Sequence, residues 1–143
     1  MQNGSPAYQG EVSCNWEEIE QLVKELALQI RKAGKRHDCI LGITNGGIIP
    51  AKLLSRELGI DAIQFIPIRS KEIIKSEMPV LHSDKKYLVI DDIYDTGDTF
   101  RKVTDALGGF ACDFCFCMSR HEQDVGLSPK VLNYEKWVVF PWE

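Results

Sequence analysis

Residues 91–99 place acidic, glycine and threonine side chains directly after an apolar run. A strand is expected to end at Ile90 and a helix to begin near Thr99, with a tight turn between them. The first backbone N–H groups of such a helix have no internal partner and attract an anion. Gly97 allows close approach of the backbone, and the hydroxyls of Thr96 and Thr99 add two donors. We therefore predict a cradle for a monophosphate here.

Two adjacent carboxylates, Asp91 and Asp92, lie beside this cradle rather than within it. Carboxylates accept hydrogen bonds from a vicinal diol and are oxygen ligands for Mg²⁺. A phosphate on one side and a diol or Mg²⁺ on the other indicate a ribose 5-phosphate. A Walker loop is excluded, because the sequence has no Gly-Lys-Ser/Thr tripeptide. The alternative is an acidic turn that only caps the helix through Asp98 or Thr99, and the length of the motif favours the functional interpretation.

The composition fits a single soluble domain over 1–143. The 143 residues are 44% apolar and 27% charged, which is ordinary for a globular protein. The net charge of -4 argues against nucleic-acid binding, which needs a basic surface. No apolar run is long enough for an integral membrane segment, and residues 1–10 lack the apolar core of a signal peptide. We therefore expect a cytoplasmic protein.

The cysteines are five, an odd number, and three of them, Cys112, Cys115 and Cys117, lie close together. A Cys-x-x-Cys pair could bind a metal. On a strand, however, Cys112 and Cys115 face opposite sides, while Cys115 and Cys117 share one side. We therefore interpret them as buried structural thiols in a reducing compartment.

Alternating helices and strands must position the site. Apolar residues at helical spacing predict a helix that starts at Trp16, after the N-cap Asn15, and ends at Gly34. Residues 1–13 are expected to be frayed, and 69–85 to be a mobile loop with a short helical or hairpin piece. The other expected helices cover 48–58 and 99–107, and the expected strands cover 39–43, 60–68, 87–90, 110–118 and 137–140.

This order favours an α/β fold of three layers, with a mostly parallel central sheet and helices on both faces. Such sheets bind ligands at the carboxyl ends of their strands, near a switch point. The turns at 44–47 and 91–99 both follow expected strands. We therefore expect them to meet at one edge of the sheet.

Four segments resemble the type I phosphoribosyltransferases, and among these the bacterial xanthine-guanine phosphoribosyltransferases. The segment Trp-Glu-Glu-Ile at 16–19 resembles the start of their first helix, and 42–60 resembles their pyrophosphate loop and second helix. Residues 89–99 resemble the motif that binds phosphoribosyl pyrophosphate (PRPP), and 137–143 resembles the end of their purine-binding hood. The resemblance implies the type I fold with a small hood, formed by 119–143 and the N-terminal segment.

The resemblance implies roles for the positions of the two turns. Asp91 and Asp92 would hold the ribose hydroxyls, with Asp92 nearer to Mg²⁺, and Asp95 would act as general acid/base at the purine N7. The 5-phosphate would be bound by Thr96, Gly97, Asp98 and Thr99. The pyrophosphate would be bound through the backbone of a loop that often contains a non-proline cis peptide, formed here by Thr44, Asn45, Gly46 and Gly47.

The resemblance also implies a purine site in the hood. Trp137 would stack on the base, and the backbone near Val138, together with Glu143, would read its edge. Relatives carry a lysine for the purine 6-oxo group after the corresponding strand, where this chain has Arg120, which could supply the cation. Relatives also carry a basic residue where Asn45 stands, so one pyrophosphate contact is weaker here.

These features predict an enzyme of purine salvage that transfers the phosphoribosyl group from PRPP to guanine, xanthine or hypoxanthine and requires Mg²⁺. The loop at 69–85, with Arg69, Lys71 and Lys75, would close over the transition state and exclude water. The alternatives are a non-catalytic PRPP-sensing regulator and a phosphoribosyltransferase for a different base. Because relatives are dimers or tetramers, we expect a homodimer or homotetramer.

Overall fold

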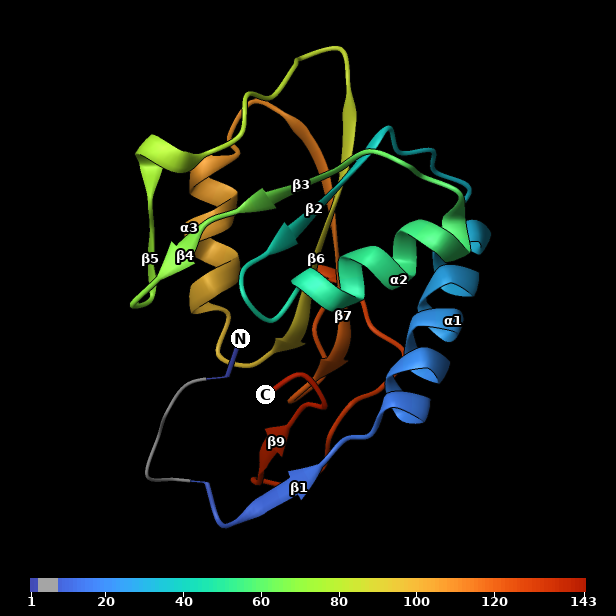
Figure 1. The fold of residues 1–143 in the computed structure, drawn as a ribbon, viewed down its shortest axis with the longest axis vertical. Coiled ribbons are helices and arrows are strands. Elements are labelled where there is room, and N and C mark those ends of the chain that lie inside the picture. The colour runs from blue at the N-terminus through green and yellow to red at the C-terminus, as the bar shows by residue number, and fades with distance from the viewer. Residues whose placement is uncertain (3–7) are drawn as a thin grey trace.

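A five-stranded sheet forms the centre of the computed structural model, which describes residues 1–2 and 8–143 (Figure 1). The strands lie in the order β3-β2-β6-β7-β8, and all neighbouring pairs are parallel. The prediction of an α/β fold with a mostly parallel sheet is thereby confirmed. In chain order the strands are β2 Cys39–Ile43, β3 Ile63–Ile66, β6 Lys86–Tyr94, β7 Ala111–Ser119 and β8 Gly126–Leu127.

Helix α1 (Trp16–Ala33) begins and ends where its flanking residues indicate. The Asn15 side chain accepts a hydrogen bond from the Glu18 N–H at 2.8 Å, and Gly34 adopts the left-handed conformation with a φ of 72°. No helix among the described residues is both long and apolar enough to cross a membrane. The buried face of α1 has side chains at intervals of three and four residues: Ile19, Leu22, Val23, Leu26, Ala27 and Ile30.

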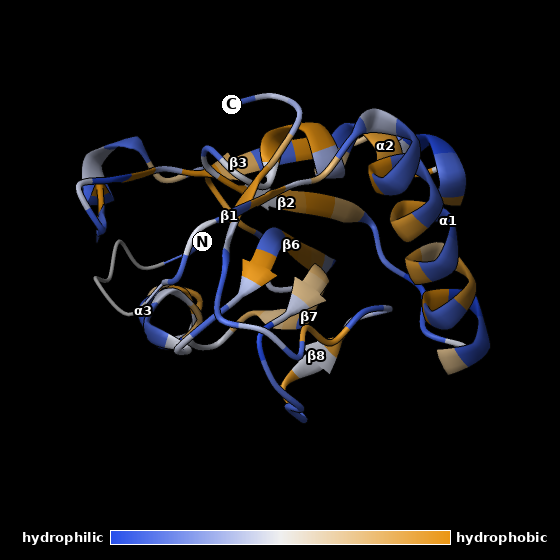
Figure 2. Cartoon of the chain, turned by 90° about the horizontal axis from the view of Figure 1, so that it is seen from below, coloured by the Kyte–Doolittle hydropathy of each residue, from blue (hydrophilic) through white to orange (hydrophobic). Residues whose placement is uncertain are grey.

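Helices cover both faces of the sheet, as predicted (Figure 2). Helices α1 and α2 (Ile48–Leu58) pack on one face, and α3 (Asp98–Ala106) lies on the other. Alternate side chains of β6 reach the two cores, because Leu88 and Ile90 pack with α1 and α2 whereas Val89 packs on the α3 side. The central strands are buried on both faces, which explains why their sequences are continuously apolar.

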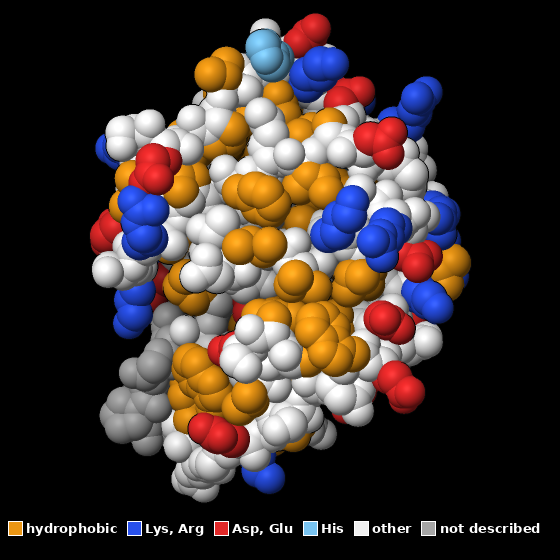
Figure 3. All heavy atoms as spheres, viewed as in Figure 1, with side chains coloured by type: hydrophobic (Ala, Val, Ile, Leu, Met, Phe, Trp, Pro, Cys, Tyr) orange, Lys and Arg blue, Asp and Glu red, His pale blue; other side chains and the backbone are white. Residues whose placement is uncertain are grey.

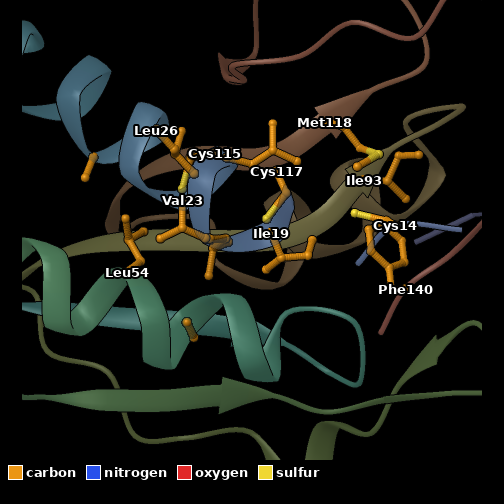
Figure 4. Packing of buried hydrophobic residues seen from close by; sticks show 14 of the residues in the cluster. Cys14, Ile19, Val23, Leu26, Leu54, Ile93, Cys115, Cys117, Met118 and Phe140 are labelled. Atoms are coloured by element: carbon orange, nitrogen blue, oxygen red, sulfur yellow. The ribbon is translucent and has the colours of Figure 1, made fainter. Parts of the chain in front are cut away.

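The cysteines of β7 are core residues. Cys115 and Cys117 are fully buried beside α1, in a cluster that also contains Cys14 (Figure 4). Cys112 packs with the cluster on the opposite face, as the strand periodicity predicts. Burial raises the pKa of the Cys115 and Cys117 thiols, so these two side chains are poor nucleophiles. All five cysteines are free.

A second, two-stranded sheet lies beyond the carboxyl ends of the central strands (Figure 1). In it β1 (Glu11–Ser13) pairs in parallel with β9 (Trp137–Val139), and the Gln9 N–H donates to the Glu135 oxygen at 2.8 Å. The prediction that residues 1–13 are frayed is therefore wrong for the part that the structure describes. The partner strand is remote in the sequence, so no local pattern could reveal this pairing.

Pro67 divides the strand that was expected over 60–68. Strand β3 stops before it, and β4 (Ile68–Arg69) then forms an antiparallel hairpin with β5 (Glu72–Ile73). A short 3-10 turn, η1 (Lys75–Glu77), follows. The expected single strand is wrong because proline has no N–H to donate to a neighbouring strand. A short helical piece or a hairpin was expected in the loop at 69–85, and the structure has both.

Candidate active site

The end of β6 carries Asp91 and Asp92 into the interior. The sequence predicts that this strand ends at Ile90, but it continues to Tyr94 because Asp91, Ile93 and Tyr94 also pair with β7. The two acidic residues therefore stand on a strand and are only 2% and 7% exposed. Each carboxylate accepts a neighbouring backbone N–H, Asp91 from Asp92 at 2.8 Å and Asp92 from Ile93 at 2.7 Å. These hydrogen bonds hold both side chains in fixed positions.

The amino group of Met1 lies against both carboxylates. Its nitrogen is 2.8 Å from Asp91 Oδ2, 2.9 Å from Asp92 Oδ1 and 2.7 Å from the Ile93 carbonyl oxygen. Burial alone would lower the pKa of this ammonium, but the two carboxylates outweigh burial and raise its pKa to about 10. Burial also raises the pKa of Asp91, against the opposing effect of the ammonium. The end of β6 is therefore a place that favours a positive charge.

A pocket lies at the turn between β6 and α3. Gly97 has a φ of 89°, and a Cβ at this position would lie 2.6 Å from the Tyr94 hydroxyl, so the turn requires a glycine. Met1 also lines the pocket. The lining contains Asp95, the predicted general acid/base, and all residues of the predicted phosphate cradle: Thr96, Gly97, Asp98 and Thr99.

The start of α3 does not have the side-chain cap that the alternative interpretation of this turn requires. The helix begins at Asp98, one residue earlier than predicted, and its N-cap is Gly97, which has no side chain to bind a helix N–H. The Asp98 N–H donates to the Thr96 hydroxyl at 3.3 Å, and the Asp98 carboxylate pairs with Arg101. Neither Asp98 nor Thr99 is therefore the N-cap. The start of α3 therefore has no side-chain N-cap, which is the arrangement that an anion bound at the helix start would need.

The loop after β2 lies directly against Asp92. A Cβ at Gly46 would be 2.3 Å from Asp92 Oδ2, and a Cβ at Gly47 would be 2.4 Å from the Ile90 carbonyl oxygen, so both positions exclude a side chain. The peptide bond between Thr44 and the next residue is cis, as the resemblance implied. These contacts place the expected pyrophosphate loop beside the Asp92 carboxylate and the backbone of β6: Thr44, Asn45, Gly46 and Gly47.

Asp95 follows β6 and is approached by three side chains. The Tyr8 hydroxyl donates a hydrogen bond to Asp95 Oδ2, and Arg120 Nε lies 3.8 Å from Asp95 Oδ1. The ring of His121 lies with Nε2 3.0 Å from the Asp95 carbonyl oxygen. Burial, assisted by the hydrogen bond to Asp95, raises the pKa of Tyr8 to about 12, so the phenol stays protonated at neutral pH. The predicted general base thus has a neutral donor and a cation beside it.

Arg120 is a buried cation where β7 meets the hood. Its side chain is 4% exposed, and its Nη1 donates to the Lys136 carbonyl oxygen at 2.6 Å. Its Nη2 donates to Gln2 Oε1, and its guanidinium carbon lies 4.5 Å from the centroid of the Tyr8 ring. The Arg120 backbone N–H donates to the Tyr94 oxygen at 2.8 Å. The hood backbone and the end of β6 together orient this side chain.

Both backbone polar groups of Val138 bind the side-chain amide of Gln2. The Val138 N–H donates to Gln2 Oε1 at 2.7 Å, and Gln2 Nε2 donates to the Val138 carbonyl oxygen at 2.8 Å. The Trp137 ring meets the Tyr8 ring edge to face, with their centroids 5.5 Å apart. The predicted purine-reading residues of β9 therefore adjoin Arg120 through Gln2 and Tyr8.

Glu143 and the cations of the expected lid have other partners. The Glu143 carboxylate accepts a hydrogen bond from the Phe140 N–H at 2.6 Å, so it binds the hood backbone. Arg69 forms an ion pair with Glu77 within its own segment, and the other two cations of the lid are exposed. The structure thus brings together the carboxylates, both turns, Arg120 and Val138. Glu143 and the three cations of the expected lid lie outside this group.

Three residues of the site, Met1, Gln2 and Tyr8, were not predicted. They belong to a polar, glycine-bearing start of the chain that has neither helical nor strand periodicity. Their side-chain and amino-group hydrogen bonds are with residues that lie more than eighty positions away. No signal within the segment itself could have indicated them.

Known proteins resemble this chain over nearly all of its length. The model of the phosphoribosyl transferase domain family matches residues 15–143. The xanthine-guanine phosphoribosyltransferase of Idiomarina loihiensis is 24% identical over 141 residues, which cover 93% of this chain and 87% of that protein.

Two solved structures are similar to the fold. The purine phosphoribosyltransferase of Pyrococcus horikoshii has 30% identity and a TM-score of 0.76, and the match covers 94% of this chain and 95% of that one. The xanthine-guanine-hypoxanthine phosphoribosyltransferase of Helicobacter pylori has 18% identity and a TM-score of 0.78, with 93% of each chain covered. Since the family model spans the sheet, both turns and the hood, this chain belongs to the phosphoribosyltransferase family.

Proposed function

We propose that this protein is a purine phosphoribosyltransferase of purine salvage, which transfers the 5-phosphoribosyl group of PRPP to guanine, xanthine or hypoxanthine and releases pyrophosphate. One observation carries the proposal. The buried Asp91 lines the pocket at the turn 95–99, and its neighbour Asp92 lies against Gly46 in the loop at 44–47. Places for a 5-phosphate, a ribose diol and a pyrophosphate thus follow one another along the carboxyl edge of the sheet.

The 5-phosphate would bind at the start of α3. The backbone N–H groups there favour an anion, and the positive φ of Gly97 lets the backbone approach it. The ribose hydroxyls would donate to Asp91 and Asp92, each of which accepts a backbone N–H through Oδ1 and has a second carboxylate oxygen as a further acceptor. The full set of 5-phosphate ligands would be Thr96, Gly97, Asp98 and Thr99.

The donor set at the end of β6 also fits Mg²⁺. In the structure Asp91 and Asp92 bind an ammonium group through one oxygen each, which supports a cation site at this position. Mg²⁺ is usually held by one or two carboxylates, with substrate oxygens and water completing its shell. Asp92 would be nearer to the ion, because it also contacts the pyrophosphate loop. When bound, Mg²⁺ would neutralise charge on the departing pyrophosphate.

Asp95 would remove or hold the proton at N7 while the purine N9 attacks the anomeric carbon. Trp137 would stack on the base, and Arg120 would donate to its 6-oxo group. A guanidinium has only donors, so it favours a 6-oxo acceptor over the 6-amino donor of adenine. The backbone N–H and C=O of Val138 would pair with the oxygen and the N1–H of the same base edge. This donor set supports a 6-oxopurine as the acceptor.

The test is nucleotide synthesis by the pure protein with PRPP, Mg²⁺ and each free base. We expect product with at least one 6-oxopurine, and we expect Asp95→Asn to lower kcat about 10²- to 10⁴-fold, the usual contribution of a general acid/base, while PRPP binding measured by calorimetry persists. The matched control is Asp105→Asn, which alters an exposed acid on α3. If every base fails although PRPP binds, the proposed enzymatic function is wrong.

A second candidate is a non-catalytic PRPP-sensing regulator, and Asn45 is the observation that favours it. Its neutral side chain stands in the predicted pyrophosphate loop, where a cation would strengthen leaving-group binding. Synthesis that Asp95→Asn abolishes would exclude the regulator. A third candidate, transfer to a different base, is tested by extending the same screen to adenine and the pyrimidines.

We further propose that the protein acts in the cytoplasm as a homodimer or homotetramer. The five free cysteines suit a reducing compartment. The small hood consists largely of two short strands and their connections, and a second copy would shield it. Residues 1–143 would act as a single domain, with residues 119–143 and the N-terminal segment forming that hood. The segment at 69–85 would close over the site during the reaction.

A further inference from the structure

The start of the chain binds the groups that the proposed function assigns to substrates. Gln2 is 8% exposed, although it is polar and stands near the end of the chain. Its amide takes part in hydrogen bonds with the backbone of Val138 and with Arg120. The N label in Figure 1 lies beside the turn that joins β6 and α3. Met1 and Gln2 therefore lie in the candidate site rather than in solvent.

The amide of Gln2 has the same polar pattern as one edge of a 6-oxopurine. Its oxygen accepts from the Val138 N–H at 2.7 Å and from Arg120, as a 6-oxo group would. Its nitrogen donates to the Val138 carbonyl oxygen at 2.8 Å, as N1–H would. A glutamine side chain and a lactam edge each present one acceptor beside one donor. Both cannot bind these groups at the same time.

Met1 and Tyr8 extend the overlap to the other parts of the site. The Met1 ammonium lies against Asp91 and Asp92, where the ribose diol and a cation would bind, and its sulfur accepts from the Thr99 hydroxyl at 3.7 Å. The Tyr8 hydroxyl donates to the carboxylate of Asp95. These contacts are with residues that would bind different parts of the substrates, so Met1, Gln2 and Tyr8 together cover the proposed ribose, phosphate and base positions.

We propose that Met1, Gln2 and Tyr8 form an autoinhibitory contact, an internal competitor that must leave before PRPP and the purine bind. The inference rests on the proposed function, since it takes its substrate positions from there. When a site is open in only a fraction of the molecules, the apparent Kd of its ligand equals the intrinsic Kd divided by that fraction. The N-terminal contact would thus set the apparent affinity for both substrates without taking part in the reaction.

The experiment compares Gln2→Ala and Gln2→Leu with the unaltered chain. Both variants remove the amide that mimics the purine edge, and leucine keeps most of its volume. We expect the KM values for PRPP and for the purine to fall about 3- to 10-fold while kcat is unchanged, because the open fraction rises. The matched control is Gln9→Ala, which removes an exposed glutamine of the same segment and should change neither KM.

A measurement without turnover separates this inference from the proposed function. Calorimetry with PRPP should show tighter binding to Gln2→Ala, and hydrogen exchange at the Val138 N–H should be faster in that variant. Equal PRPP affinities in an active enzyme would overturn autoinhibition and leave the proposed function intact. A rise in KM would also overturn it, because Gln2 would then belong to the substrate site. Absence of PRPP binding to every variant would refute the proposed function and, with it, this inference.

Discussion

At the residue scale, Arg120 makes contacts that a surface arginine would lack. Its guanidinium donates to the hood backbone, stacks on Tyr8 and lies near Asp95, and almost all of its surface is buried. A buried cation needs such partners, because desolvation of the charge is costly. The carboxylates and the glycine turn were predictable from residue type alone, since few other functions need them together. Arg120 was predictable only through a resemblance.

We expect Arg120→Met to lower kcat/KM for hypoxanthine about 30- to 100-fold, which corresponds to loss of one charged hydrogen bond worth about 2 to 3 kcal/mol. Arg120→Lys keeps a donor and should recover most of this loss. The measurement is steady-state kinetics, with thermal unfolding to check the fold. Arg56→Met, which changes an exposed arginine of α2, is the control. Equal activity of Arg120→Met and the unaltered chain would remove Arg120 from the base site.

At the element scale, local signals predicted the helices better than the strand ends. Asn15 and Gly34 correctly predicted the two ends of α1, because capping depends only on neighbouring residues. The predicted end of β6 was wrong because the true end depends on pairing with β7. The pairing of β1 with β9 was missed for the same reason. Strand limits are set by partners that are distant in sequence, so a single sequence carries little information about them.

One ion-pair cluster ties the segment after α1 to β7. The Lys35 nitrogen is 3.1 Å and the His37 Nε2 is 2.7 Å from the carboxylate of Asp113. Partial burial would raise the pKa of Asp113, but the hydrogen bonds from His37 and Lys35 outweigh it and hold the pKa below its usual value. A lowered pKa stabilises the fold above the unfolded pKa of about 3.9, and this stability is lost as the pH falls through the native pKa.

We therefore expect Asp113→Asn to lower the free energy of unfolding at pH 7 by at most about 1 kcal/mol, since 40% of the carboxylate side chain is exposed and solvent screens the pair. The difference should shrink in acid and vanish below about pH 3. Urea denaturation at several pH values measures it, with the exposed Asp61→Asn as control. A difference that stays constant from pH 7 to pH 2 would contradict the electrostatic explanation.

At the scale of the whole molecule, apolar surface remains uncovered. Figure 3 shows hydrophobic side chains across the face on which β3 and α2 lie in Figure 1. Phe65 on β3 is 40% exposed, and Ile48 at the start of α2 is 36% exposed. Contiguous apolar surface of this kind commonly marks an interface. The architecture was predictable from the alternation of elements, whereas the contacts between copies are not encoded in any local pattern.

Light scattering coupled to size exclusion tests the expected self-association. At micromolar concentration the mass should be at least about twice the 16.2 kDa of one chain. Phe65→Ser, which removes an exposed aromatic ring from β3, should shift the mass toward that of one chain if this face forms the contact. A mass of one chain for the unaltered protein would contradict the expectation of a homodimer or homotetramer.

The pairing of β1 with β9 has a consequence for the order in which the protein is made. Strand β1 is synthesised early, but its partner Trp137–Val139 follows only after the whole central sheet. Domains begin to fold during synthesis, and long-range pairings form last. A nascent chain that has been translated as far as β7 would hold the carboxylates and the glycine turn without the β9 backbone that we propose reads the base. The sheet of β1 and β9, which would carry the purine site, is therefore the last part of this fold to form.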